Sequence, residues 1–391
     1  MNRYIIQYHS RTLAALAKRA KQQTFPLSGW IFNYPNLPNY ELKIALSDHV
    51  KRADNINLHT GLNITADVKA DSEEEAKDTS KNHVETLLNL ISFSTLTYCD
   101  AATLVSIISI TDEETHPFSY YVYPFSEQEI IGGLRIIDQP TFETVFEADD
   151  KSSYQSRTQR ALTWLRKGIG EENAVDQFIC YWTALEVIKG ILRRNLRYQI
   201  RNPGEWDGIK VILANKLSFQ NFDAIKHARR RLFHGGKEED KLDDDFLREI
   251  KAYLEPMRKA LVFGIGSIWR LGDSTTISTI ASKTPRRIKQ MPWTVLKGNL
   301  ENLPRDFNEL IKNYPTLEGE ITNKKFSISQ DEDLKVEFTV THRFHATGAV
   351  SFTPTETQVR GKKDSGIQQL ALKEAHVISK GNRIDLKPTK I

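Results

Sequence analysis

Residues 229–236 read Arg-Arg-Arg-Leu-Phe-His-Gly-Gly and end a stretch with the periodicity of an amphipathic helix. The two glycines can end this helix, because glycine readily adopts the left-handed conformation that follows many helices. At about 100° of rotation per residue, Arg229 falls inside the apolar arc, whereas Arg230 and Arg231 point away from it. A guanidinium on an apolar face is costly unless it is paired or has a function. The apolar arc is formed by Phe222, Ile225, Ala228, Leu232 and Phe233.

A second helix, predicted over residues 172–193, carries a matching anomaly. Glu186 falls in the middle of its apolar face, next to Ile179 and Trp182. Two opposite charges, each misplaced on the apolar face of its own helix, predict a buried ion pair between Arg229 and Glu186. In the alternative, the helical phase drifts by a residue or two and both side chains reach solvent. The apolar face consists of Val175, Phe178, Ile179, Trp182 and Leu185.

The block Asp176–Glu186, DQFICYWTALE, is followed some forty residues later by Arg229, four intervening residues, His234 and Gly235. This combination resembles the HEPN superfamily and, more narrowly, the ApeA-like HEPN domains of bacterial anti-phage defence proteins. The resemblance covers residues 153–272, about a third of the chain. It implies a helical bundle with an aromatic-rich helix that ends in Ala-Leu-Glu and a later helix that carries arginine and histidine before glycine.

The resemblance implies metal-free RNA cleavage by attack of the 2′-hydroxyl, which these side chains could support. His234 has a suitable intrinsic pKa for proton transfer, and Arg229 can donate two parallel hydrogen bonds to phosphate oxygens. Glu186 would hold Arg229 in one rotamer. One histidine cannot easily act as both acid and base, and the resemblance supplies an answer. It implies a homodimer, or a higher even oligomer, in which two Arg/His sets face one composite cleft.

Basic residues concentrate around this candidate site and suit a phosphate-bearing ligand such as RNA. Most such clusters are ordinary solvated helix surface, which is the alternative. The family pattern often has a small or polar residue directly after the arginine, where this chain has Arg230. A five-residue separation turns about 140°, so Arg229 and His234 converge only if the helix loosens near its end. The predicted RNA-binding residues are Arg230, Arg231, Lys226, Arg193, Arg194 and Arg197.

The chain of 391 residues is 39% hydrophobic and 27% charged, with a net charge of +4, which is typical of a globular protein of two or three domains. We expect an α+β fold, divided at composition and periodicity changes. No apolar run is long enough to cross a bilayer, and two cysteines in separate elements favour a cytoplasmic protein with free thiols. The expected parts are an N-terminal mixed α/β domain (1–128), a linker (129–152), a helical bundle (153–272) and a C-terminal strand-rich region (280–391).

Periodicity and capping residues also predict individual elements. The expected helices span 71–95, 154–167, 172–193, 206–217, 221–234 and 243–271, with Gly168 and Gly170 ending the second of them and Pro256 kinking the last. The expected strands span 40–50, 56–70, 102–110, 118–122, 318–328, 334–344 and 350–352.

No metal or other cofactor is expected. His342 and His345 would point to opposite faces of a strand, and His49, His59 and His83 are separated without the spacing of metal ligands. The leading hypothesis is therefore a metal-independent endoribonuclease that cuts tRNA, mRNA or other cellular RNA, with a possible phage-derived trigger or partner protein. In the alternative, a HEPN-like bundle serves dimerisation and partner or nucleic-acid binding without catalysis.

Overall fold

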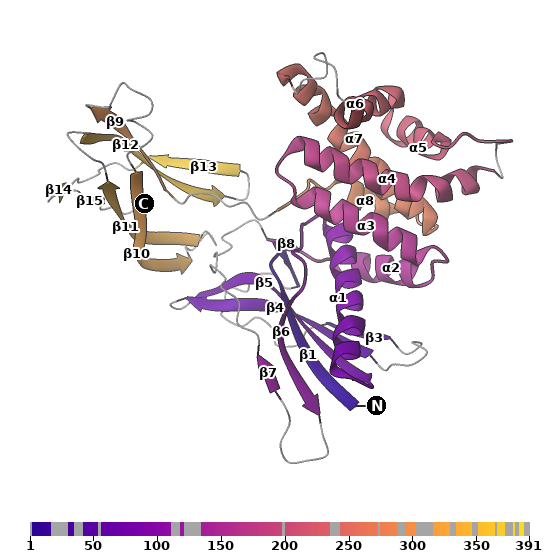
Figure 1. Cartoon of the computed structure of the whole chain (residues 1–391), viewed down its shortest axis with the longest axis horizontal. Coiled ribbons are helices and arrows are strands. Elements are labelled where there is room, and N and C mark those ends of the chain that lie inside the picture. Colours follow the sequence, from indigo (N-terminus) through magenta and orange to yellow (C-terminus); the bar gives the residue numbers. More distant parts are fainter. Residues whose placement is uncertain are drawn as a thin grey trace.

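The computed structural model of the chain is α+β, as the sequence predicts (Figure 1). Its N-terminal part is an antiparallel sheet with one long helix, its middle is helical, and its C-terminal part consists of strands. The structure describes residues 2–16, 30–34, 42–53, 56–110, 118–120, 134–197, 200–234, 243–272, 274–287, 294–301, 316–328, 334–345, 351–363, 366–371, 378–379 and 383–386.

The N-terminal sheet has six strands in the order β3-β4-β5-β1-β6-β7, with every neighbouring pair antiparallel. The predicted strands of this region are confirmed, with small changes of length. The central strand β1 is not predicted from the sequence, although its buried positions alternate as expected for a half-buried strand. The strands are β1 (Asn2–Ser10), β3 (Trp30–Tyr34), β4 (Leu42–Ala53), β5 (Ile56–Ala70), β6 (Thr103–Ile110) and β7 (Phe118–Tyr120).

Helix α1 (Glu73–Thr95) packs on this sheet and begins where the sequence predicts. The Ser72 hydroxyl accepts a hydrogen bond from the Glu75 backbone N–H at 3.2 Å, and the Glu75 carboxylate accepts one from the Asp71 N–H at 3.0 Å. These reciprocal bonds satisfy backbone donors at the helix start. Three acidic residues in the first turn add favourable interaction with the helix dipole.

Seven further helices follow among the described residues in the middle of the chain. Helix α2 lies in the range 129–152, where the sequence predicts a linker with a short helix, and its Phe142 and Val145 are fully buried. Helix α8 is not predicted from the sequence. The helices are α2 (Gln139–Asp150), α3 (Gln155–Gly170), α4 (Ala174–Leu196), α5 (Asp207–Leu217), α6 (Phe222–His234), α7 (Asp244–Ile268) and α8 (Thr275–Ser282).

The prediction that the helix starting at residue 154 ends at residue 167 is wrong, because α3 runs through Gly168 and ends at Gly170. A Cβ atom at Gly168 would lie 2.5 Å from Cε1 of Tyr181 on α4. The glycine is therefore required by close helix–helix packing and not by helix termination. Helix α7 contains Pro256, as predicted.

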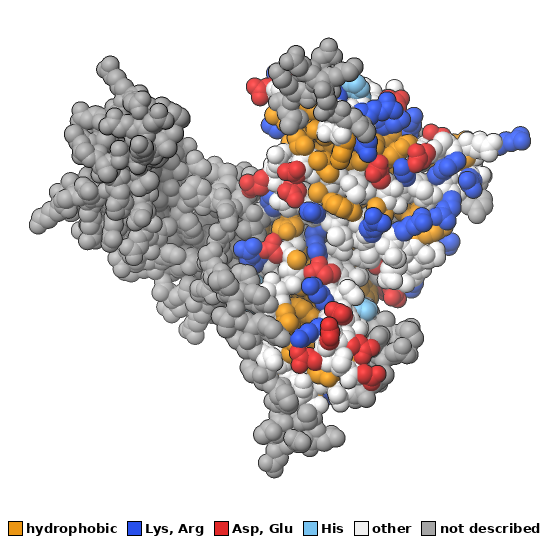
Figure 2. All heavy atoms as spheres, viewed as in Figure 1, with side chains coloured by type: hydrophobic (Ala, Val, Ile, Leu, Met, Phe, Trp, Pro, Cys, Tyr) orange, Lys and Arg blue, Asp and Glu red, His pale blue; other side chains and the backbone are white. Residues whose placement is uncertain are grey.

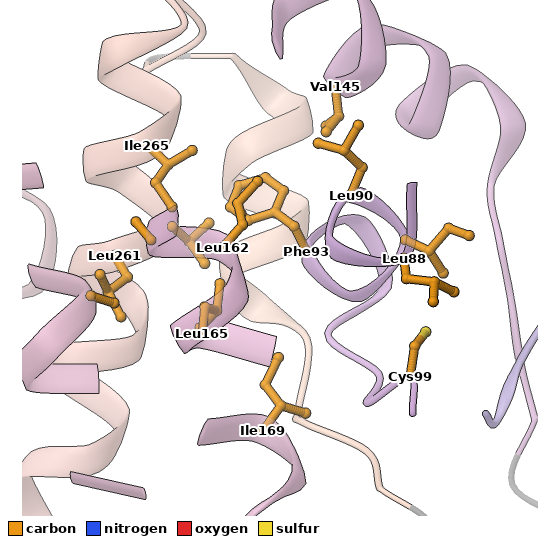
Figure 3. Packing of buried hydrophobic residues seen from close by; sticks show 14 of the residues in the cluster. Leu88, Leu90, Phe93, Cys99, Val145, Leu162, Leu165, Ile169, Leu261 and Ile265 are labelled. Atoms are coloured by element: carbon orange, nitrogen blue, oxygen red, sulfur yellow. The ribbon is translucent and has the colours of Figure 1, made fainter. Parts of the chain in front are cut away.

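One hydrophobic core joins the sheet and the helices. On α1, the Leu88 side chain points toward Cys99 (Figure 3). Phe93 of the same helix packs against Trp269, with ring centroids 5.1 Å apart. Figure 3 shows Phe93 beside Leu162 of α3, with Ile265 of α7 close by. Helix α1 thus fixes the helical part relative to the N-terminal sheet.

The C-terminal strands form a four-stranded sheet, β10-β11-β15-β14, and a three-stranded sheet, β13-β12-β9. In Figure 1 they form a group of their own at the left, away from the helices. Among the described residues, no helix has the length and apolar character needed to span a bilayer. The strands are β9 (Thr294–Glu301), β10 (Thr316–Ile328), β11 (Leu334–His345), β12 (Ser351–Lys363), β13 (Gly366–Ala371), β14 (Ile378–Ser379) and β15 (Arg383–Leu386).

Candidate functional site

Two helices, α4 and α6, present the residues that the sequence singles out. Helix α4 begins after Asn173, whose side chain accepts a hydrogen bond from the Val175 N–H at 2.8 Å. Helix α6 begins after Asn221, whose side chain accepts from the Ala224 N–H at 3.2 Å. Both caps are of the kind that fixes a helix start, so the phase of each helix, and with it the placement of Glu186 and Arg229, is set locally.

An aromatic cluster holds these two helices to the turn before α5. Trp182 of α4 lies 4.7 Å from Trp206, the residue before α5, and 6.2 Å from Phe222 of α6, measured between ring centroids. Trp206 and Phe222 are 5.3 Å apart. Tilted and offset ring pairs at these distances are the favoured arrangements of aromatic side chains. This packing fixes the positions of α4, α6 and the start of α5 relative to one another.

An open pocket of about 190 Å³ lies at this junction of α4, α6 and the start of α5. Four of the residues predicted for the site line it, namely Glu186, Lys226, Arg229 and Arg230. The other lining residues are Trp182, Lys189, Glu205 and Trp206. With four cations and two carboxylates, the pocket carries an excess of positive charge.

The predicted buried ion pair between Arg229 and Glu186 is not formed. Both residues are half-buried, and no ion pair within 4 Å joins them in the part of the chain that the structure describes. The Arg229 guanidinium lies over the ring of Phe233, with Cζ 4.8 Å from the ring centroid. Phe233 itself is 48% exposed, although the helical period places it on the apolar arc.

The ion pairs among the residues that line the pocket neutralise only part of its positive charge. The Lys189 ammonium lies 2.6 Å from the Glu205 carboxylate and 4.6 Å from the centre of the Trp206 ring. The Glu186 carboxylate makes no hydrogen bond or ion pair with any described residue. A half-buried carboxylate among cations, with none of them bound to it, is available to a ligand.

The predicted RNA-binding residues fall into two groups. Lys226 and Arg230 line the pocket, and Arg230 is exposed. The others do not line it. Arg231 lies over the Phe246 ring of α7 at 3.8 Å and within 3.8 Å of Glu249, so it packs α6 on α7.

Arg193, Arg194 and Arg197 lie near the end of α4, outside the pocket. Arg193 donates a hydrogen bond to the carbonyl of Pro203 at 2.9 Å, which indicates a structural role. Arg194 is exposed, with its guanidinium 5.5 Å from the ring centre of Tyr154, and Arg197 is exposed. In the face drawn in Figure 2, lysine and arginine side chains gather over the helical part of the molecule.

His234 is the last residue of α6, and its side chain lies outside the described residues, as do Gly235 and Gly236. Its convergence with Arg229 therefore stays a prediction.

The residues that line the pocket but are not predicted from the sequence are Lys189, Glu205 and Trp206. Periodicity could not have found Glu205 or Trp206, because they precede α5 in a turn and lie on no helical face.

The N-terminal sheet contains an arrangement that the sequence-based expectation of separated histidines did not foresee. Strand pairing brings the rings of His9 and His49 to within 4.6 Å of one another, and His59 lies 3.6 Å from Asp48. Burial lowers the pKa of His59 to about 4, and burial together with His49 lowers that of His9 to about 4. Among the described residues, no group of three or more His, Cys, Asp or Glu side chains is arranged to hold a metal ion.

Comparison with known proteins gives no match: no family model, no curated protein and no solved structure matches the chain. The resemblance to HEPN domains therefore depends on the motif residues of α4 and α6 alone.

Proposed function

We propose that this chain is a metal-independent endoribonuclease of the HEPN type, whose site is the pocket between α4 and α6. The observation that carries the proposal is the meeting of Glu186 and Arg229 at one pocket, together with Lys226 and Arg230. These residues come from two helices some forty residues apart, and the positive excess around them suits an RNA phosphate. The proposed setting is the bacterial cytoplasm, in anti-phage defence or as a toxin, with tRNA or mRNA as substrate.

In the proposed mechanism, His234 removes the proton from a ribose 2′-hydroxyl, and the 2′-oxygen attacks the adjacent phosphorus. Arg229 donates hydrogen bonds to the phosphorane oxygens, where negative charge develops. His234 of a second copy protonates the leaving 5′-oxygen, which is why the proposal requires a homodimer or a higher even oligomer. The products are a 2′,3′-cyclic phosphate, or the 3′-phosphate that follows from it, and a 5′-hydroxyl.

The role of Glu186 differs from the sequence-based expectation, because its carboxylate does not pair with Arg229. It lines the pocket and is open to a ligand. We therefore place Glu186 among the residues that contact RNA, and leave the orientation of Arg229 to the stacking on Phe233.

The proposal is tested by RNA cleavage in EDTA with wild type, Arg229→Ala, His234→Ala and a control, Arg160→Ala. Arg160 is exposed on α3 and does not line the pocket. We expect a loss of cleavage on the order of 100-fold or more in the first two variants, since a proton-transfer group or a charge-stabilising donor contributes at least that much. Thermal unfolding checks that each variant is folded. Equal cleavage by wild type and His234→Ala would contradict the proposal.

A non-catalytic binding module is the second candidate, and one observation favours it. The pocket offers four cations and two indole rings, which suffice for binding without any proton-transfer group. If folded wild-type protein binds RNA but does not cut it, alone or with extract of phage-infected cells, this second function replaces the first.

A further inference from the structure

We infer that the RNA site extends beyond the pocket, along the exposed side of α4, to three arginines that bind backbone phosphates of the same strand. The three are Arg157 of α3 and Arg194 and Arg197 at the end of α4, and we call them the distal arginines. This inference rests on the proposed function for its ligand. It names the substrate class, which is a single strand of several nucleotides rather than a mononucleotide.

The distal arginines are free to bind a ligand. All three are exposed, and no ion pair within 4 Å joins any of them to a carboxylate among the described residues. Their neighbour Arg193 differs, because it is half-buried and donates a hydrogen bond to the carbonyl of Pro203. Guanidinium groups donate paired hydrogen bonds to phosphate oxygens. Three of them on one surface therefore suit a phosphodiester backbone.

Helix packing brings the distal arginines together at the seam between α3 and α4. The Arg194 guanidinium lies 5.5 Å from the ring centre of Tyr154, the residue before α3. Arg157 comes three residues after Tyr154, and Arg197 comes three residues after Arg194. Residues at this spacing are neighbours on a helix surface, so the three guanidinium groups surround one half-buried tyrosine.

Arg157 lies on the side of α3 that faces α4. Gly168 marks this side, because a Cβ atom there would lie 2.5 Å from the Tyr181 ring of α4. At about 100° per residue, Arg157 is about 20° from Gly168 around the helix, whereas Arg160 is about 80° from it. Arg160 is equally exposed but is turned away from the seam, which makes it a matched control.

An unobstructed stretch of α4 connects the pocket to the distal arginines. Glu186 lines the pocket, and Gly190 and Arg194 follow at intervals of four residues, so each is a surface neighbour of the one before. Beyond the helix itself, no described atom lies within 4 Å of the position that a Cβ atom of Gly190 would take. Eight residues of α-helix span about 12 Å. A strand with one phosphate at the pocket therefore needs further nucleotides to reach Arg194.

The two ends of this path carry the same kind of side chain. Lys226 and Arg230 line the pocket at one end, and the distal arginines lie at the other, beside the ring of Tyr154. Cations that follow a path, together with an aromatic ring, are the arrangement by which proteins bind single-stranded RNA. The occupant of the path is therefore RNA.

Fluorescence anisotropy of the full chain with a labelled single-stranded RNA of about 20 nucleotides tests the inference, since this length covers the pocket and the distal arginines. The test variant replaces the three distal arginines by methionine. The slope of log K against log salt should fall by about 2, because each phosphate contributes about 0.7, and at about 0.1 M salt binding should weaken on the order of 100-fold.

A control variant removes three exposed cations that lie elsewhere. It should keep the slope and bind RNA within about threefold of wild type, because it loses the same charge but no phosphate contact. Equal RNA binding by the test and control variants would overturn the inference. The control substitutions are Arg160→Met, Lys251→Met and Arg270→Met.

A pair of variants at Gly190 tests the path itself. Gly190→Glu places a carboxylate on it, and Gly190→Gln is the uncharged match. The open space accepts either side chain, and either replacement raises helix propensity, so both variants should fold. Gly190→Glu should bind RNA about fivefold more weakly than Gly190→Gln, which is the effect of one phosphate contact at about 0.1 M salt. Equal binding by the two variants would show that the strand does not cross α4 and would overturn the inference.

Shorter ligands and a lipid surface complete the test. UMP and inorganic phosphate reach only the pocket, so wild type and the test variant should bind them alike. A loss of UMP binding as large as the loss of RNA binding would overturn the inference. If the test variant lost binding to phosphatidylserine vesicles but kept the RNA affinity of wild type, a lipid headgroup would replace RNA as the ligand.

Cleavage separates this inference from the proposed function. If wild type cuts RNA, and the test variant binds and cuts the same RNA equally well, the ribonuclease stands and the extended site fails. If wild type cuts no RNA, but the test variant alone loses RNA binding, the extended site stands and the ribonuclease fails.

Discussion

Two groups of cationic side chains, one at the pocket and one where α1 meets the helical part, differ in what they bind. At the pocket, Lys226 and Arg230 lie on the surface of α6, and the nearest described carboxylate to Lys226 is 3.9 Å away. At the other place, Lys283 donates a hydrogen bond to the carbonyl of Ser94 at 2.7 Å, and Arg135 donates one to the carbonyl of Thr95. The first group is open to a ligand, and the second is bonded within the protein.

The second group acts on helix ends. Helix α1 has no basic residue in its own last turn, although its terminal carbonyls carry partial negative charge. Lys283 and Arg135 supply the missing cations from distant segments. Arg258 donates to the carbonyl of Ala281 at the end of α8 at 3.4 Å, and Arg287 donates to the carbonyl of Glu171 after α3.

Burial and mutual repulsion make the charged form of these cations less favourable. Burial, together with the charges of Arg286 and Arg258, lowers the pKa of Arg135 to about 10. None of Arg135, Arg258 and Lys283 pairs with a carboxylate within 4 Å among the described residues. Counting basic residues in a sequence therefore does not identify a nucleic-acid surface. The partner of each cation decides its role.

The largest expected effect on stability comes from a buried histidine that is uncharged in the folded protein. It contrasts with the buried cations, which keep their charge because they bind carbonyl groups. His59 is 1% exposed and has a pKa of about 4, whereas an unfolded histidine titrates near 6.5. Below about pH 6.5 the unfolded chain binds the proton and the folded one does not, so stability falls as the pH drops towards 4. We expect His59 to account for a loss of up to about 3 kcal/mol.

Urea unfolding between pH 7.5 and 4.5 measures this loss. Replacing His59 by Gln should flatten the pH dependence, whereas the same change at the exposed His227 should leave it unaltered. An unchanged pH profile in His59→Gln would show that burial of this imidazole does not set the acid sensitivity of the sheet.

Lys283 and Lys226, both half-buried, test the comparison directly. Lys283→Met should lower the free energy of unfolding by about 2 kcal/mol, because the buried Ser94 carbonyl loses its donor. Lys226→Met should lower it by less than about 1 kcal/mol, since an ion pair as long as 3.9 Å with an exposed carboxylate contributes little. RNA affinity should show the reverse order. If Lys226→Met destabilised the protein as much as Lys283→Met, the distinction between the two groups of cations would be wrong.

The helices that carry the candidate site are predictable from sequence because their signals are local. Asn221 and the apolar residues Phe222, Ile225 and Ala228 fix the start and phase of α6, and the three apolar side chains are buried as predicted. The α1 start is predictable for the same reason, through Ser72. Such caps and periods act over one or two turns.

The predictions that fail are those that depend on contacts with other segments of the chain. Two separate helical phases predict the ion pair between Arg229 and Glu186, but the distance between the two side chains depends on how the helices cross. It also depends on Phe233, whose ring lies under the Arg229 guanidinium. The sequence predicts a helix end at Gly168, because the constraint that requires this glycine, the Tyr181 ring, belongs to another helix. The approach of His9 to His49 follows only from strand order, which no local pattern contains.

The smallest expected effect concerns the salt dependence of RNA binding. A protein that neutralises one phosphate of single-stranded RNA changes the slope of log K against log salt by about 0.7. If Arg230 binds a phosphate, Arg230→Met should reduce the slope by that amount and leave the free energy of unfolding within about 0.5 kcal/mol of wild type. Arg160→Met, an equally exposed change away from the pocket, should leave the slope unaltered. Equal slopes in wild type and Arg230→Met would place Arg230 with the solvated arginines of the surface, and Lys226 would then be the only member of the first group that binds RNA.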